Sequence, residues 1–62
     1  MKEKDFRQII KLKRKELGFS QKDLAGLLGI RPSTLSNYEN GKTELGADKL
    51  EKIFSILRIK VN

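Results

Sequence analysis

The 62-residue sequence contains no cysteine and no histidine, and these absences exclude several classes of site. Without cysteine the chain cannot form a disulfide, as is usual for proteins of a reducing cytoplasm. Without either residue, the common nucleophile–base pairs and imidazole or thiolate metal sites cannot be built. No apolar run approaches the ~18 residues of a membrane-spanning helix, and the N-terminus lacks the apolar core of a signal sequence. The sequence therefore predicts a cytoplasmic protein without a metal or cofactor.

Positive charge exceeds negative charge, and the excess is concentrated near the N-terminus. Fourteen Lys and Arg residues oppose eight Asp and Glu residues, which gives a net charge of +6. A small basic domain favours a polyanionic partner, most often nucleic acid and less often anionic lipid. Half of the cations lie within the first fifteen residues, at Lys2, Lys4, Arg7, Lys11, Lys13, Arg14 and Lys15.

Hydrophobic periodicity predicts consecutive helices within a single all-α domain, residues 1–62. The first helix is expected at about residues 4–17, with Gly18 directly after it. The last is expected at about residues 47–57, where apolar residues follow the i, i+3, i+4, i+7 pattern. Because the apolar face of the first helix is needed for the core, binding to a membrane is disfavoured. The expected core faces of these two helices contain Phe6, Ile10, Leu17, Leu50, Ile53, Phe54 and Leu57.

Two short helices are expected between them, separated by a three-residue turn that contains glycine, which is the pattern of a helix-turn-helix. The first, residues 21–28, begins after Ser20, a good N-cap, and ends at Gly29, which suits a left-handed turn. The second, residues 32–39, begins at Pro32, whose missing N–H is not needed in a first turn. The inward positions of this unit are small or apolar, namely Leu24, Ala25, Leu28, Ile30, Leu35 and Tyr38.

The outer face of the second short helix consists of weak helix formers that prefer caps and turns. Contact with base edges in the major groove explains the presence of these residues, because such contact needs short hydrogen-bonding side chains. Asn37 can pair with adenine, Thr34 can offer its methyl group to thymine, and the two serines can bond to a base or a phosphate. The alternative for each is a solvated polar side chain. We predict base contacts from Arg31, Ser33, Thr34, Ser36 and Asn37.

The run "LGFSQKDLAGLLGIRPSTLSNYENGK" and the closing pattern "L..IF.IL.I" resemble the lambda-repressor-like helix-turn-helix family, also called the Cro/C1 or XRE type. The resemblance covers roughly residues 6–59 and implies a compact bundle of four to five helices. It implies a homodimer that binds a pseudo-palindromic operator on double-stranded DNA and regulates transcription, most often as a repressor. It also implies phosphate contacts from Gln21, Asn40, Lys42 and Thr43.

The resemblance further implies a partly buried ion pair between Arg14 and Glu39. A carboxylate left exposed on a recognition helix would repel phosphate, so the pair also protects the DNA-binding face. Three apolar residues near the C-terminus lie off the expected core face. These residues are Ile56, Ile59 and Val61. We predict that they form the dimer interface; the alternative is that they complete the core of the monomer.

Other functions stay open at this point. The chain also resembles antitoxins of the Hip toxin–antitoxin systems, whose main partner is a toxin protein. A phage repressor or a restriction-modification controller protein would have the same DNA-binding unit. An enzyme such as a nuclease is disfavoured, because the acidic residues beyond Glu16 all have capping, pairing or surface explanations: Asp23, Glu39, Glu44, Asp48 and Glu51. We therefore predict that the protein is not an enzyme.

Overall fold

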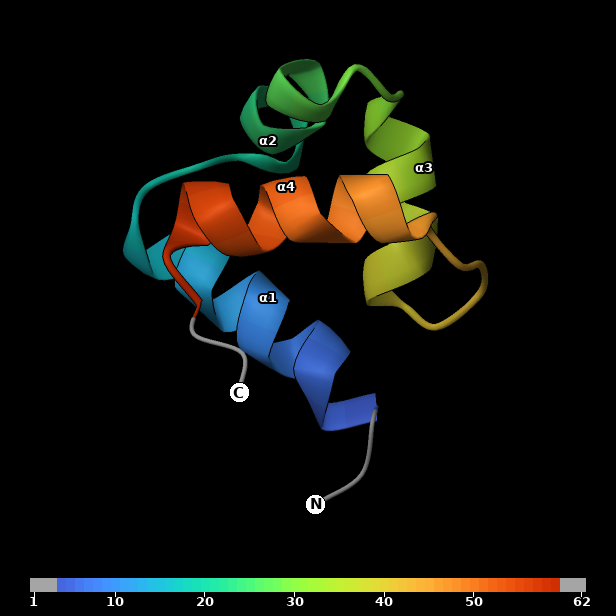
Figure 1. Cartoon of the computed structure of the whole chain (residues 1–62), viewed down its shortest axis with the longest axis horizontal. Helices are drawn as coiled ribbons and strands as arrows, with labels where there is room; N and C mark the ends of the chain where they lie inside the picture. Colours follow the sequence, from blue (N-terminus) through green and yellow to red (C-terminus); the bar gives the residue numbers. More distant parts are fainter. Residues whose placement is uncertain (1–3, 60–62) are drawn as a thin grey trace.

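The computed structural model describes the backbone of residues 4–59 and the side chains of residues 6–59. This part of the chain forms four helices: α1 (Lys4–Glu16), α2 (Gln21–Leu28), α3 (Pro32–Glu39) and α4 (Ala47–Leu57). In Figure 1, α4 crosses the middle of the view, with α1 below it, α2 above it and α3 to the right. The four helices expected from the sequence are all present. No helix of this described part is both long and apolar enough to cross a membrane.

The four helices meet in one apolar core. α2 and α3 supply most of it, and α1 and α4 close it from the other sides. The rings of Phe6 and Phe54 join α1 to α4, with their centroids 4.8 Å apart. Full burial of a leucine or isoleucine side chain stabilises the fold by about 1.5–3 kcal/mol, so this small cluster holds the domain together. The buried apolar residues are Ile10, Leu24, Ala25, Leu28, Leu35, Tyr38, Ile53 and Leu57.

The expectation that Leu17 belongs to the core is wrong. Leu17 lies just beyond α1 and is 47% exposed. The chain turns there because Gly18 has a φ of 85°, and the N–H of Phe19 then donates to the carbonyl oxygen of Arg14 at 2.9 Å. Beyond this turn Phe19 is partly buried and packs against the core.

Ile56 and Ile59, two of the three residues predicted at a dimer interface, pack partly buried against the core of their own chain. This packing agrees with the alternative expectation, in which these residues complete the monomer. It leaves part of each side chain accessible. The third residue, Val61, lies outside the described residues.

Gly26 offers a direct test of helix propensity in α2. It occupies an exposed position inside the helix, and a Cβ atom added there would meet no heavy atom within 4 Å. Glycine in a helix interior costs about 0.5–1 kcal/mol relative to alanine. We therefore expect Gly26→Ala to raise the free energy of unfolding by about that amount, measured by urea denaturation.

The matched control for this variant is Gly29→Ala. Gly29 also has open space around it, but its φ of 72° lies in the left-handed region. A side chain in that conformation costs roughly 1–2 kcal/mol, so this variant should be less stable than the parent. Similar urea midpoints for the two variants would contradict the explanation by backbone conformation.

Candidate nucleic-acid interface

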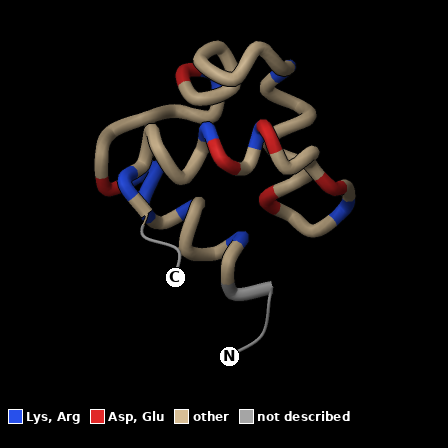
Figure 2. Tube along the Cα trace, viewed as in Figure 1, with Lys and Arg blue, Asp and Glu red and all other residues tan. Residues whose placement is uncertain are grey.

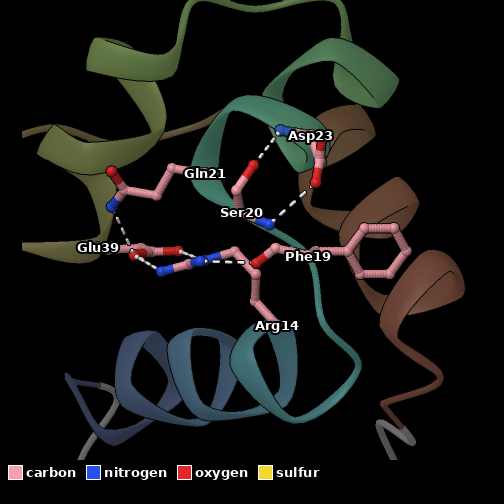
Figure 3. Close-up of polar contacts among 6 residues, drawn as sticks. All are labelled: Arg14, Phe19, Ser20, Gln21, Asp23 and Glu39. Carbon is pink, nitrogen blue, oxygen red and sulfur yellow. Dashed lines mark hydrogen bonds and ion pairs between the residues drawn. The ribbon is translucent and has the colours of Figure 1, made fainter.

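The start of α2 is fixed by a reciprocal pair of hydrogen bonds between Ser20 and Asp23. The Asp23 N–H donates to Ser20 Oγ at 2.9 Å, and the Ser20 N–H donates to the Asp23 carboxylate at 3.2 Å (Figure 3). This capping box satisfies two N–H groups that the helix itself leaves without partners. It also places the Asp23 charge at the positive end of the helix dipole.

The turn between α2 and α3 follows from three consecutive residues. Gly29 adopts the left-handed conformation, and the N–H of Ile30 donates back to the Ala25 carbonyl oxygen at 3.0 Å. This bond is the mark of a Schellman C-cap. Arg31 is extended, with φ −79° and ψ 147°, because Pro32 disfavours a helical residue before it. α2 and α3 thus form the helix-turn-helix that the sequence predicts.

α3 has two chemically different sides. Leu35 and Tyr38 are buried in the core, whereas Ser33 and Asn37 are exposed. Between Pro32 and Tyr38 the helix carries no charged residue, and its tube in Figure 2 is correspondingly tan there. We call the predicted base-contacting set the recognition face. It consists of the exposed Arg31, Ser33 and Asn37 and the partly buried Thr34 and Ser36.

Three of the four residues predicted to contact phosphate lie directly beyond the C-terminal end of α3. Asn40 caps the helix, and Gly41 turns the chain with a φ of 79°. The N–H of Lys42 then donates to the Asn37 carbonyl oxygen at 2.8 Å. Asn40 and Lys42 are exposed, and Thr43 is partly buried. We call residues 40–46 the α3–α4 loop.

Arg14 and Glu39 form the ion pair that was predicted between α1 and α3 (Figure 3). Arg14 Nε donates to Glu39 Oε2 at 2.8 Å, and Arg14 Nη2 donates to Glu39 Oε1 at 3.1 Å. The two side chains are only 6% and 1% exposed. Arg14 Nη1 also donates to the Phe19 carbonyl oxygen at 2.8 Å, so the guanidinium is bonded on all of its nitrogens. The Glu39 charge is therefore removed from the exposed side of α3.

Gln21 takes part in the same network. Its Nε2 donates to Glu39 Oε1 at 3.0 Å, which links the first residue of α2 to the last residue of α3 (Figure 3). Gln21 was predicted as a phosphate ligand. An amide nitrogen carries two hydrogens, and one of them is used inside the protein. The capping box uses the N–H groups of Ser20 and Asp23, so only those of Gln21 and Lys22 in the first turn of α2 lie outside it.

Arg7 connects α1 to the end of α3, and the sequence reasoning missed this role. Arg7 was counted only as one of the N-terminal cations. Its spacing from Ile10 and Arg14 is i, i+3, i+7, which places it on the inner face of α1. This spacing is the signal that would have found it. Its guanidinium bonds to Tyr38 and to two residues of the α3–α4 loop, Thr43 and Glu44.

The phenol of Tyr38 is influenced by its burial and by two charged neighbours, Arg7 and Glu44. Burial raises the pKa of its phenol above the ordinary value, the positive charge of Arg7 opposes this rise, and the Glu44 carboxylate adds to it. A neutral Tyr38 at physiological pH adds no negative charge near the recognition face.

In the described part of the chain, no three acidic side chains gather as a metal ion would need.

Comparison with known proteins relates this chain to one family. The model of the helix-turn-helix family HTH_3 matches residues 10–62. Two curated relatives, from Sinorhizobium medicae (strain WSM419) and Rhizobium meliloti (strain 1021), are each 40% identical over 53 residues, and both are named as uncharacterized HTH-type transcriptional regulators.

The matched region covers 86% of this chain and 38% of each relative, so the chain spans about two fifths of the length of these relatives. No solved structure gives a significant match. The family match extends over most of the chain and includes the complete α2–turn–α3 unit described above. The chain therefore belongs to the Cro/C1-type (XRE) family of DNA-binding helix-turn-helix domains.

Proposed function

We propose that this protein regulates transcription by placing α3 in the major groove of double-stranded DNA and reading its sequence there. One observation carries the proposal, namely the division of α3 into a buried apolar side and an exposed side of short, uncharged, hydrogen-bonding residues. Such residues stabilise a helix poorly, so their concentration on one exposed face points to contact with base edges.

The residues of the recognition face have distinct proposed roles. Asn37 is exposed and can form a bidentate pair with adenine. Arg31 precedes the helix and can reach guanine or a phosphate. Ser33 and Ser36 can bond to either base type, and Thr34 can contact the methyl group of thymine.

Phosphate contacts are proposed around the C-terminal end of α3. Lys42, Asn40 and Thr43 follow this end in sequence, and Gln21, at the start of α2, is bonded to Glu39, the last residue of α3. Contacts to phosphates fix the register of a recognition helix, and helix N-termini are favourable places for them. The net charge of +6 supports binding to the DNA backbone.

We further propose that the protein acts as a homodimer and a repressor on a pseudo-palindromic operator. Two recognition helices related by a two-fold axis reach successive major grooves when the half-sites are about one helical turn apart, roughly 34 Å. The accessible parts of Ile56 and Ile59, together with Val61, are the proposed dimer contacts. A dimer bound across a promoter would block transcription by occupancy.

The test is a selection of binders from a random duplex library at roughly physiological salt, because non-specific binding dominates at low salt. We expect enrichment of a pseudo-palindrome. Asn37→Asp is the matched control, since the added carboxylate on the recognition face repels the DNA without changing the size of the side chain. A folded protein that enriches no sequence would contradict sequence reading. Co-purification with a toxin protein would instead favour the antitoxin alternative.

A further inference from the structure

We propose that Arg7 is a positioning residue for DNA binding, which acts by holding the α3–α4 loop in the conformation that contacts phosphate. This inference rests on the proposed function. Arg7 belongs to α1, far from the recognition face in sequence, and its side chain is only 18% exposed. Its guanidinium nevertheless contacts the last turn of α3 and two residues of the loop.

The contacts form a clamp across the base of the loop. Arg7 Nη1 donates to the carbonyl oxygens of Tyr38 and Thr43, the latter at 2.9 Å. Arg7 Nη2 donates to Glu44 Oε2 at 3.0 Å. The guanidinium carbon also lies 4.3 Å from the centroid of the Tyr38 ring, within the range of a cation–π interaction.

The clamp needs arginine for geometric reasons. A guanidinium presents five N–H donors in a rigid plane, so it can bond to several acceptors and stack on an aromatic ring at the same time. A lysine ammonium keeps the charge but has no planar fork. The positive charge also lies at the C-terminal end of α3, where the helix dipole is negative.

Arg7 acts on DNA through the loop and not directly. Both of its terminal nitrogens are engaged with acceptors inside the protein, and most of its side chain is covered. The Thr43 carbonyl that it holds is one residue from Lys42, whose exposed side chain is the proposed phosphate anchor. When that carbonyl is released, the chain around Lys42 is tied to α3 only by the bonds from the Gly41 and Lys42 N–H groups, and the Lys42 side chain becomes less well positioned.

A double-mutant cycle of Arg7→Lys and Lys42→Ala tests this coupling. We expect Lys42→Ala to weaken binding to the selected and to random duplexes about equally and to reduce the salt slope by about one. Arg7→Lys should have the same pattern, with a loss of about three- to tenfold, although it preserves the charge. In the Lys42→Ala background, Arg7→Lys should change affinity by less than about twofold, because both act on one contact.

Amide hydrogen exchange in the absence of DNA gives a second, independent measurement. Arg7→Lys should accelerate exchange in residues 41–45 and leave the core amides of Leu35 and Ile53 protected. Arg7→Gln replaces it if Arg7→Lys does not fold. Glu51→Gln is the control, because it removes an exposed carboxylate on α4 that is not among the residues bonded to Arg7. It should keep loop protection and bind DNA at least as tightly as the parent.

The outcomes separate the two proposals. Additive losses in the cycle, or unchanged exchange in residues 41–45, would overturn the positioning role while DNA binding itself still stands. If the parent protein binds no duplex, the proposed function fails and the positioning role fails with it. Faster loop exchange in that case would show only that Arg7 orders the loop.

Discussion

Replacing Glu39 with glutamine is expected to lower the free energy of unfolding by about 3–5 kcal/mol, because it strands the buried charge of Arg14. The Arg14 and Glu39 side chains are 6% and 1% exposed, so water cannot replace the lost carboxylate. Glutamine has nearly the same shape but provides one acceptor oxygen in place of two. It also removes the negative charge that offsets the desolvation of the guanidinium.

A domain of this length has a total stability of roughly 3–9 kcal/mol, so the Glu39→Gln variant should lose roughly a third to all of it. Thermal melts followed by circular dichroism measure the effect, with about 4–8 °C expected per kcal/mol. Glu44→Gln makes the same chemical change in an exposed ion pair. Such pairs contribute about 0–1 kcal/mol, so this control should melt close to the parent. Equal midpoints for the two variants would refute the assignment of Glu39 to a buried pair.

A double variant, Arg14→Met with Glu39→Leu, separates a stranded charge from lost packing. Replacing both members of a buried pair by apolar residues of similar size is often neutral or stabilising, whereas removing one member is costly. We therefore expect the double variant to regain most of the stability that Glu39→Gln loses. A double variant as unstable as Glu39→Gln would show that packing around the pair, and not the unpaired charge, causes the loss.

The same network connects stability to the proposed binding function. Glu39 accepts from Arg14 on α1 and from Gln21 on α2, while it is itself the last residue of α3. The Glu39 carboxylate thus joins three helices. A loss of this carboxylate should change DNA affinity through the orientation of α3 as well as through the folded fraction.

The local features of the fold could be predicted from the sequence because they depend on neighbouring residues. Ser20 with Asp23, the left-handed Gly29 and Pro32 at the start of α3 each determine a helix boundary within a few residues. Leu17 was placed wrongly for a related reason, since helical spacing extends the apolar face one residue beyond Glu16. Helical spacing takes no account of the turn at Gly18, after which Phe19 packs against the core while Leu17 is exposed.

The candidate site was only partly predictable, because some of its contacts join residues far apart in sequence. Arg7 meets Tyr38 and Thr43 across separations of 31 and 36 residues. Charge counting cannot distinguish such an arginine from a solvated lysine. The Arg14–Glu39 pair was predicted from the family resemblance, although it also joins distant residues. The bases that the recognition face selects depend on how α3 is seated in the groove of a bound duplex, which the protein sequence does not specify by itself.

Asn37→Ala is expected to separate DNA reading from stability. It should lower the affinity for the selected DNA site and preserve or raise the free energy of unfolding. Loss of a bidentate pair with adenine should cost about 1–3 kcal/mol on the selected site and relax selection at one base position. Because alanine is the better helix former, the free energy of unfolding should stay level or rise by up to about 0.7 kcal/mol.

Fluorescence anisotropy with the selected duplex and a random duplex measures the difference, and Lys42→Ala is the comparison. Lys42→Ala should weaken both complexes equally, since a phosphate contact carries no sequence information. Asn37→Ala should weaken only the selected complex. Equal losses on both duplexes would make Asn37 another backbone contact. A selective loss in a protein that is no less stable would explain why a helix built on a firm apolar core presents such weak helix formers on its outer face.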